Sequence, residues 1–265
     1  MQGKRVVLTG ATGGIGRAIA KQLGKEGASL VLVARDKQRL ADLVDELGSD
    51  MNLAVAADLS NDDARRRVAD ACRKIGDPGI SLLINAAGIN EFGLFEKQSA
   101  ELIRNLLYVN LLSPILLTQE LLPLLQQQAQ GRIINIGSTF GSIGYPGFSG
   151  YCASKFGLRG FTEALRRELA DSNIRVSYVA PRATRTDLNS DNIVAMNDEL
   201  GTAMDDPDQV AREVMQVISG PENSDRYIGW PEKFFVRVNA LFPQIVDSSL
   251  RKQLPTIRRF AKTGT

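Results

Sequence analysis

Short apolar runs alternate with longer stretches of helical pattern along the first 180 residues of the chain. The apolar runs are rich in Val, Ile and Leu, as in strands that are buried on both faces of a sheet. They predict strands at residues 5–9, 29–34, 52–57, 81–85, 132–136, 175–179 and 226–228. The stretches between them predict helices at residues 14–26, 36–47, 61–75, 101–128 and 150–170.

Successive strands recur about every 25 residues, which is close to the size of one β-α-β unit. This alternation predicts an α/β fold, a single-domain doubly wound parallel sheet (Rossmann-like) with a C-terminal helical extension. No Pro-, Gly- or Ser-rich linker divides the chain, so we expect one domain over residues 1–228 and the extension over 229–265. Residues 182–206 carry few apolar side chains, which predicts a mobile substrate loop or lid.

Composition narrows the possible chemistry. The chain has 265 residues, 43% hydrophobic and 23% charged, with a net charge of +2, so we expect no nucleic-acid partner. It contains no histidine, which excludes Ser-His-Asp hydrolysis, Cys-His chemistry and histidine-metal sites. Cys72 and Cys152 form neither a metal-binding nor a disulfide pattern, so we expect no metal and a reducing, cytoplasmic location.

The apolar stretches are too short or too interrupted for membrane insertion. The first strand follows the N-terminus directly and is too short for a secretory signal, so none is expected. Residues 106–125 are Leu-rich, but Asn110, Ser113 and Pro114 interrupt them. We therefore expect a buried helix there and not a membrane span.

Tyr151 and Lys155 stand four residues apart in a predicted helix, so their side chains share one face. The pKa of tyrosine is normally about 10, and a nearby cation lowers it by favouring the phenolate. Ser138 follows the strand predicted at 132–136, where an open α/β sheet delivers side chains to a ligand crevice. The three residues suggest an acid–base site; a solvated helix face is the alternative for the Tyr-Lys pair.

Residues 9–16, Thr-Gly-Ala-Thr-Gly-Gly-Ile-Gly, join the first strand to the first helix. Glycines here permit a tight turn and let backbone N–H groups approach a pyrophosphate at the helix N-terminus. We therefore expect a dinucleotide site, with an ordinary turn as the alternative.

Arg35 ends the second predicted strand, where a carboxylate would bind a ribose 2′-hydroxyl. Its planar cation suits a 2′-phosphate, and Arg17 after the glycine turn is placed to join it. NADP(H) is therefore favoured over NAD(H). Asp36 leaves a question open, because its carboxylate either disfavours a phosphate or caps the next helix. Asp58 with Leu59, after the third strand, either binds adenine or begins a helix.

Asn85-Ala86-Ala87-Gly88, after the fourth strand, completes an ordered set of motifs. The other members are Thr9-Gly10-x-x-x-Gly14-Ile15-Gly16, Asp58, Asn110, Ser138, Tyr151-x-x-x-Lys155, Pro181 and Thr186. With these motifs the chain resembles the short-chain dehydrogenase/reductase family, up to about residue 230.

The resemblance implies roles for these residues. Tyr151 would be the acid or base at the substrate oxygen, and Ser138 would stabilise the charge on that oxygen. Lys155 would lower the pKa of Tyr151 and bind the nicotinamide ribose. Asn110 would hold a water that relays protons to solvent, although it also suits a polar kink in an apolar helix. The implied cofactor-binding residues are Thr9, Gly10, Thr12, Gly14, Ile15, Gly16, Arg17, Arg35, Asp58, Leu59, Asn85, Ala86, Ala87, Gly88, Tyr151, Lys155, Pro181 and Thr186.

The resemblance implies an NADP(H)-dependent, homo-oligomeric oxidoreductase that reduces a ketone or aldehyde to an alcohol, or runs the reverse reaction. The alternative is a catalytically silent nucleotide-sensing regulator on the same fold. A mostly apolar pocket would suit a lipophilic or acyl-type substrate, and its candidate residues are Thr139, Phe140, Tyr145 and Phe148. Arg182 stands where the family has glycine; with Arg185 it either binds an anionic substrate group or is solvated.

Residues 229–265 form a basic tail with a net charge of +5, against −3 for the rest of the chain. Apolar residues at 234, 238, 241, 242 and 245 share one helical face that Pro243 interrupts, so we expect two short helices. Four interpretations are open. The tail packs on its own domain, closes the substrate pocket with Phe234 and Phe235, forms a subunit interface, or lies on an anionic membrane.

Overall fold

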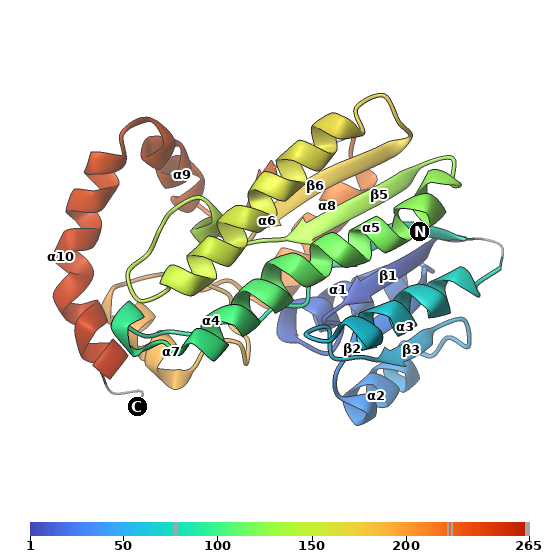
Figure 1. Cartoon of the computed structure of the whole chain (residues 1–265), viewed down its shortest axis with the longest axis horizontal. Helices are drawn as coiled ribbons and strands as arrows, with labels where there is room; N and C mark the ends of the chain where they lie inside the picture. Colours follow the sequence, from blue (N-terminus) through green and yellow to red (C-terminus); the bar gives the residue numbers. More distant parts are fainter. Residues whose placement is uncertain (77–78, 222, 224, 263–265) are drawn as a thin grey trace.

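Seven parallel strands form one sheet at the centre of the molecule, in the order β3-β2-β1-β4-β5-β6-β7 (Figure 1). The structure is a computed structural model, and it describes residues 1–76, 79–221, 223 and 225–262. The strands are β1 (Arg5–Thr9), β2 (Ser29–Ala34), β3 (Leu53–Ala56), β4 (Ile80–Asn85), β5 (Gly131–Ile136), β6 (Ile174–Ala180) and β7 (Asp225–Tyr227). The strand order reverses between β1 and β4, which places the ligand crevice at their carboxyl ends. The doubly wound α/β fold is confirmed.

Helices cover both faces of the sheet. One core joins the sheet to α1 (Gly14–Lys25), α2 (Lys37–Leu47) and α8 (Pro207–Ser219). The other core joins it to α3 (Asp62–Arg73), α5 (Ser113–Gln126) and α6 (Ser149–Glu168). α8 is not among the helices predicted from the sequence, although Val210, Val214 and Val217 form its buried face.

The helix expected at 101–128 is two helices joined by a π-helical turn. α4 (Ala100–Leu107) continues through this turn, Tyr108–Leu112, into α5. By length and composition alone the run Ala100–Gln126 could cross a membrane, and 33% of its most apolar window is buried. Its leucines at 117, 121 and 125 are fully buried in the core under the sheet, so we assign the helix to the layered fold.

The third strand differs from the prediction. The sequence predicts a buried strand at 52–57, but β3 is shorter, and Leu53, Ala54 and Ala56 are exposed. β3 is an edge strand, so its outer side has no neighbouring strand to cover it. An apolar pattern alone does not distinguish an edge strand from a central one.

The C-terminal extension leaves the sheet after β7 and forms α9 (Glu232–Leu241) and α10 (Pro243–Lys262). The helices separate at Phe242, as Pro243 predicts, but α10 is 20 residues long and not short. Residues 263–265 of the expected tail lie outside the described residues. α10 stands across one end of the molecule, where it contacts α7 (Asp191–Glu199), the helix within loop 182–206 (Figure 1).

Candidate active site

The glycine turn between β1 and α1 is too tight for side chains at several positions. Gly10 has a φ of 67°, and a Cβ there would lie 2.7 Å from the backbone of Ala87. A Cβ on Gly16 would collide with the carbonyl of Gly10. Gly13 precedes α1, and no side chain of the described residues caps the helix there. Its first N–H groups are therefore free for a phosphate, and the turn fits a dinucleotide pyrophosphate.

Thr9 joins the glycine turn to the segment after β4. Its hydroxyl oxygen accepts hydrogen bonds from the backbone N–H groups of Ala86 and Ala87, both at 3.1 Å. Ala87, Leu59 and Thr9 also line one small hollow. Residues predicted at three separate strand ends therefore lie together.

Asn85 uses its side chain within the sheet. Its amide nitrogen donates to Asn135 Oδ1 at 2.8 Å and to Thr118 Oγ1 at 3.2 Å. Asn135 in turn donates to Thr162 at 2.8 Å. This buried ladder fixes β4 against β5 and its covering helices, and the predicted contact of Asn85 with a cofactor stays a prediction.

Arg35 lies exposed at the end of β2, as predicted. No carboxylate of the described residues forms an ion pair with it. The neighbouring Asp36 caps α2, because its Oδ1 accepts from the N–H groups of Gln38 and Arg39 at 2.9 and 3.0 Å. The helix-capping alternative for Asp36 is therefore correct, and this carboxylate is already engaged when a phosphate approaches Arg35.

A second arginine, Arg39, lies over the glycine turn, and the sequence analysis missed it. It donates to the carbonyl of Thr12 at 3.0 Å and lies 3.7 Å from the exposed carboxylate of Asp187. Arg39 follows Arg35 by four residues, and this spacing could have indicated that the two arginines lie close together. Arg17 behaves differently: its guanidinium pairs with Glu46 at 2.6 Å, so its role at a 2′-phosphate stays a prediction.

Asp58 does not cap a helix. Asn61 caps α3 by accepting from Asp63 and Ala64, whereas Asp58 accepts from the N–H of Ser60 at 3.0 Å in a local turn. This hydrogen bond and the charge of Arg35 hold the pKa of the Asp58 carboxyl below its usual value. Asp58 is therefore an exposed acceptor near Arg35, and its contact with adenine stays a prediction.

Tyr151 and Lys155 lie together at the start of α6, both almost fully buried. Burial raises the pKa of Tyr151 to about 12, although a hydrogen bond with Ser138 acts in the opposite direction. Burial also lowers the pKa of Lys155 to about 8. The Lys155 ammonium lies 5.7 Å from the centre of the Tyr151 ring and donates to the carbonyl of Ile136 at 3.2 Å.

The expectation that Lys155 brings the pKa of Tyr151 toward neutrality is therefore wrong for this structure. Both shifts have the same cause, because a buried site disfavours the charged form of either side chain. With this raised pKa, Tyr151 carries its proton at neutral pH.

Ser138 is held by a residue that the sequence analysis did not identify. The hydroxyl of Tyr178 on β6 lies 3.1 Å from both the backbone nitrogen and the backbone oxygen of Ser138. A Cβ on Gly137 would collide with the Tyr178 ring, and a Cβ on Gly141 would collide with the Tyr178 hydroxyl. These two glycines around the serine were the only hint in the sequence that a large ring lies there.

Asn110 lies in the π-helical turn and is 1% exposed. Its side chain accepts from Ile89 N at 2.8 Å and donates to Ile89 O at 2.9 Å and to Ser154 Oγ at 3.1 Å. It fixes the segment after β4 beside α6, and a Cβ on Gly88 would lie within 3.6 Å of both Asn110 and Lys155. Its place beside Lys155 is compatible with the proton relay, which stays a prediction.

Arg182 pairs with carboxylates of the protein and does not point into solvent. Its Nη2 and Nε lie 2.7 and 2.9 Å from Asp205 Oδ1, and its Nη1 lies 3.3 Å from Glu232 and 3.2 Å from the carbonyl of Trp230. The solvated alternative for Arg182 is therefore wrong, and the carboxylates that engage it belong to the protein itself. No described residue other than glycine has a positive φ, so arginine fits this backbone without strain. Arg182 ties loop 182–206 to the C-terminal extension.

The segment after β6 contacts both the region around Ser138 and the glycine turn. The Pro181 carbonyl accepts from Thr139 N at 3.0 Å, beside Ser138. A Cβ on Gly14 would lie 2.5 Å from the Thr186 methyl group, so Thr186 lies directly on the glycine turn. Arg185 between them is exposed. Pro181 and Thr186 are therefore placed where a bound cofactor would pass.

Aromatic rings surround Tyr151, as the predicted apolar pocket requires. Phe140 stacks on Tyr145 at 4.8 Å, and both Phe140 and Phe148 lie 6.4 Å from Tyr151. Ile257 of α10 is fully buried in the same cluster. Phe234 and Phe235, expected to close this pocket, are 50% and 42% exposed instead. The extension therefore closes the cluster with α10, not α9.

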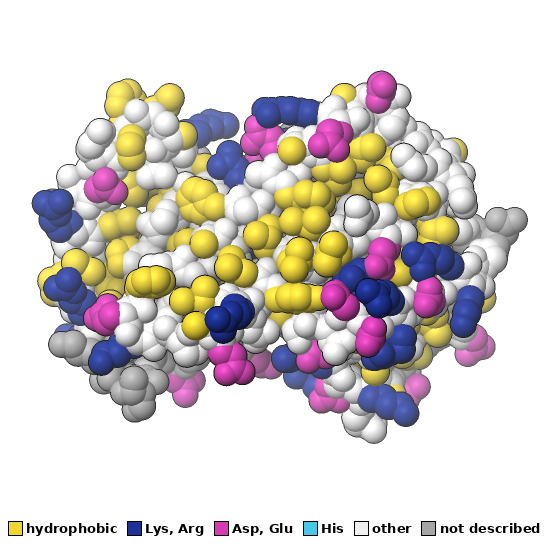
Figure 2. All heavy atoms as spheres, in the orientation of Figure 1, with side chains coloured by type: hydrophobic (Ala, Val, Ile, Leu, Met, Phe, Trp, Pro, Cys, Tyr) yellow, Lys and Arg dark blue, Asp and Glu magenta, His cyan; other side chains and the backbone are white. Residues whose placement is uncertain are grey.

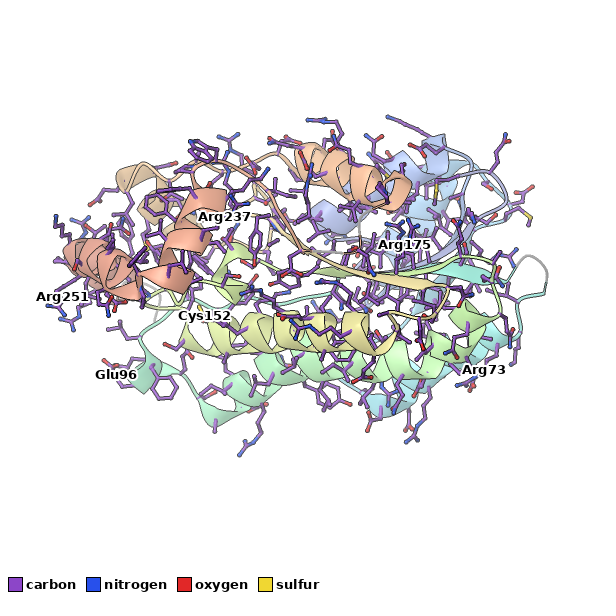
Figure 3. All side chains as sticks on the ribbon, turned by 90° about the horizontal axis from the view of Figure 1, so that it is seen from above. Arg73, Glu96, Cys152, Arg175, Arg237 and Arg251 are labelled. Carbon is purple, nitrogen blue, oxygen red and sulfur yellow. The ribbon has the colours of Figure 1, made fainter. Side chains whose placement is uncertain are left out.

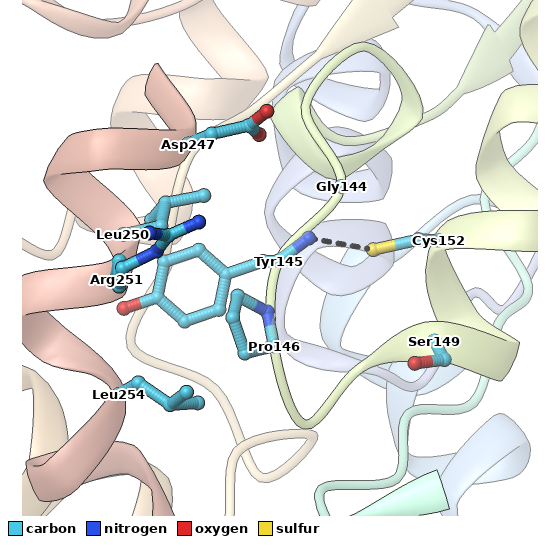
Figure 4. A pocket seen from close by; sticks show the side chains of 9 residues that line it. All are labelled: Gly144, Tyr145, Pro146, Ser149, Cys152, Asp247, Leu250, Arg251 and Leu254. Carbon is cyan, nitrogen blue, oxygen red and sulfur yellow. Dashed lines mark hydrogen bonds between the residues drawn. The ribbon is translucent and has the colours of Figure 1, made fainter. Parts of the chain in front are cut away.

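A hollow of about 380 Å³ separates α10 from the segment before α6 (Figure 4). The Tyr145 ring lies between them and donates its hydroxyl hydrogen to Gln253 on α10 at 3.0 Å. Cys152 lines the inner wall, where it accepts from Tyr145 N at 3.4 Å, as a packing residue would. Leu250, Leu254 and Arg251 form the outer wall.

Known proteins with related sequences include reductases. Residues 4–196 match the model of the short chain dehydrogenase family. The chain is 40% identical over 181 residues to nodulation protein G of Rhizobium sp. strain N33, covering 68% of this chain and 73% of that protein. It is 33% identical to the 3-oxoacyl-(acyl-carrier-protein) reductase of Vibrio cholerae, over 84% of this chain and 92% of the other.

Solved structures agree. The 3-ketoacyl-(acyl-carrier-protein) reductase of Brucella melitensis, determined with NADH, superposes with a TM-score of 0.78 at 28% identity, covering 87% of this chain and 98% of that chain. The silent-regulator alternative has no support among these enzymes. The glycine turn, Ser138 with the buried Tyr151 and Lys155, and these relatives lead to one conclusion: the chain is an enzyme of the short-chain dehydrogenase/reductase family, an oxidoreductase that uses a nicotinamide cofactor.

Proposed function

We propose that this protein is an NADP(H)-dependent reductase that converts a lipophilic or acyl-type ketone or aldehyde to an alcohol, or runs the reverse reaction. The observation that carries the proposal is the buried Tyr151, with the Lys155 ammonium 5.7 Å from its ring centre and with Phe140 and Phe148 around it. A neutral phenol is the form that donates a proton, and its aromatic surroundings favour an apolar substrate.

Each residue has one task in this chemistry. The nicotinamide cofactor, when bound, supplies or accepts the hydride. The Ser138 hydroxyl donates a hydrogen bond to the substrate carbonyl oxygen and positions it beside Tyr151 Oη. Tyr151 gives its proton to that oxygen as negative charge develops. The Lys155 ammonium, 5.7 Å from the ring centre, offsets part of the cost of burying the phenolate that remains, although burial still dominates the pKa of Tyr151.

Positive charge at the end of β2 supports the choice of NADP(H) over NAD(H). Arg35 is exposed there, Arg39 lies over the glycine turn, and Asp36 is occupied as a helix cap. A 2′-phosphate would meet two guanidinium groups at this place, whereas a 2′-hydroxyl has no need of them.

A 3-oxoacyl thioester is the first substrate class to test, because two of the relatives are named as 3-oxoacyl or 3-ketoacyl reductases. The exposed Arg185 beside Thr186 is the available cation for an anionic group on such a substrate. Arg182 is not available, since Asp205 and Glu232 engage it.

The test is NADPH oxidation over a panel of acetoacetyl thioesters, long-chain ketones and small sugars. We expect turnover of thioesters or ketones, and a loss of kcat of about 100-fold or more in Tyr151→Phe. NADPH binding to the variant, followed by cofactor fluorescence, controls for folding. Turnover of sugars alone, or an unchanged kcat in Tyr151→Phe, would contradict the proposal.

The same proposal includes a cytoplasmic homo-oligomer with a peripheral membrane contact. Apolar side chains form a band over α4, α5 and α6 (Figure 2), which includes the exposed Leu107, Leu112 and Phe156. A second copy would cover such a band. Light scattering is expected to give a multiple of the monomer mass, reduced to the monomer in Leu112→Lys/Phe156→Lys; a monomeric wild type would exclude the oligomer.

A further inference from the structure

The segment that connects β7 to α10 exposes an unusual concentration of large apolar side chains. They are between 42% and 73% exposed and form what we call the aromatic corner: Trp230, Phe234, Phe235, Leu241, Phe242 and Ile245. In Figure 2 apolar side chains project at the upper left, where Figure 1 places α9 and the start of α10. Single exposed apolar residues are ordinary, but a contiguous set marks a contact surface.

The aromatic corner is not needed to hold α9 in place. Val236 is 7% exposed on the inner side of α9, and Asn239 donates to the carbonyl of Ser142 at 2.9 Å. Val246, also 7% exposed, anchors the start of α10. These buried residues anchor the segment. The exposed rings therefore contribute little to the stability of the fold.

The charge around these rings is predominantly positive. Lys233 and Arg237 lie among them in the sequence, and residues 229–265 carry a net charge of +5 with Glu232 and Asp247 included. Glu232 faces Arg182, whose guanidinium it shares with Asp205. Arg237 and Arg251 lie at the same end of the molecule, away from Arg73 and Arg175 (Figure 3). The surface therefore complements negative charge.

We propose that the aromatic corner inserts into the interfacial region of an anionic lipid bilayer, with Lys233 and Arg237 at the phosphate level. The inference specifies the lipid and the residues of the peripheral membrane contact proposed above, and rests on that contact. A projecting set of Trp, Phe and aliphatic side chains flanked by cations is what a bilayer interface accepts. A second copy is better matched by the aliphatic band over α4, α5 and α6.

This docking site is connected to the catalytic loop. Arg182 donates to the carbonyl of Trp230, in the aromatic corner, and to Asp205, at the end of loop 182–206. The Arg182 side chain therefore links the aromatic corner directly to loop 182–206, which lies over the cofactor site. A lipophilic substrate dissolved in the bilayer would meet the enzyme at this surface.

Vesicle sedimentation of the full-length protein tests the proposal without any need for turnover, so its failure is distinct from failure of the reductase assignment. We expect binding to vesicles of phosphatidylcholine and phosphatidylglycerol in equal parts, and much weaker binding to phosphatidylcholine alone. Lys233→Glu/Arg237→Glu should lower the partition coefficient by about 100-fold. Leu241→Ser/Ile245→Ser should lower it by at least about 10-fold.

Two matched variants serve as controls. Arg66→Glu/Arg67→Glu makes the same charge change on α3, and Met51→Ser/Leu53→Ser removes exposed apolar residues at the opposite edge of the sheet. Both should bind like the wild type. The proposal is overturned by absent binding at low salt or by equal losses in the control variants. It is also overturned if Leu241→Ser/Ile245→Ser lowers the oligomer mass while vesicle binding persists, because a second copy then covers the corner.

Discussion

The hydroxyl of Tyr178 lies 3.1 Å from both the amide nitrogen and the carbonyl oxygen of Ser138. Tyr178 is fully buried on β6, and Ser138 follows β5, so the contact joins the ends of adjacent strands. It fixes the backbone of the residue whose hydroxyl must meet the substrate oxygen. Tyr178 is thus a positioning residue that reaches the substrate only through Ser138.

Tyr178→Phe should separate positioning from chemistry. The change removes one hydroxyl from a buried site and leaves the Ser138 N–H without its partner. We expect stability to fall by about 2 kcal/mol and kcat to fall about 10- to 100-fold, with KM for NADPH little changed. Thermal unfolding and steady-state kinetics provide these values.

Tyr227→Phe is the matched control, because its hydroxyl on the neighbouring strand bonds Ser142 at 2.7 Å and not Ser138. It should lose comparable stability and keep kcat. Equal losses of kcat in the two variants would show that Tyr178 has only a structural role.

The sequence predicts the buried strands well and the edges poorly. β1 and β2 have the predicted limits, because a central parallel strand is a nearly continuous apolar run bounded by polar residues. β3 has a similar pattern but is exposed, since strand order is set by contacts between distant segments. The π-helical turn at Asn110 is also hidden from a periodicity analysis, because the apolar pattern continues through it.

The same distinction applies to the site. Local spacing is enough to place Tyr151 and Lys155 on one helical face. It does not reveal the contact of Tyr178 with Ser138 or the pairing of Arg182 with Asp205, which span 40 and 23 residues. It also overstates the effect of Lys155 on Tyr151, because the degree of burial that dominates both pKa values is a property of the fold.

Arg182→Gly introduces the residue that is usual in the family at this position. It should destabilise the fold and the attachment of loop 182–206. Asp205 is 2% exposed, and without Arg182 its carboxylate is left buried and unpaired. We expect a loss of about 3 kcal/mol in unfolding free energy and faster proteolysis within loop 182–206. Chemical denaturation and timed trypsin digestion measure the two effects.

Arg185→Gly removes an exposed arginine from the same loop and controls for general loosening by glycine. It should cost little stability. If the two variants behaved alike, the ion pairs of Arg182 would contribute nothing to the attachment of the extension.

Lys155→Met should change how stability depends on pH. Burial lowers the pKa of Lys155 from 10.5 to about 8 in the folded chain. Between these values the unfolded chain binds a proton that the folded chain has released, so wild-type stability rises with pH across this window. Relative to Lys155→Met, the wild type should gain about 2 to 3 kcal/mol from pH 8 toward 10.5.

Urea unfolding at a series of pH values measures this difference. The raised pKa of Tyr151 lowers stability above pH 10 in both proteins, so it cancels when the two curves are subtracted. Lys97→Met changes an exposed lysine and should follow the wild type. Parallel curves for the wild type and Lys155→Met would mean that Lys155 is not desolvated as its burial implies.

Arg35→Glu should reverse the choice of cofactor. Arg35 is exposed at the end of β2, and a carboxylate in its place repels a 2′-phosphate but accepts a hydrogen bond from a ribose 2′-hydroxyl. We expect the Kd for NADPH to rise about 10- to 100-fold and the Kd for NADH to stay level or fall. Fluorescence titration with each cofactor measures both constants, and Arg66→Glu on α3 controls for the change in net charge.

Equal binding of the two cofactors by the wild type, unaltered in Arg35→Glu, would mean that Arg35 is a surface residue and that the glycine turn alone governs recognition. If only NADPH binding weakens, the guanidinium of Arg35 binds the 2′-phosphate. Arg39 is then the next residue to substitute.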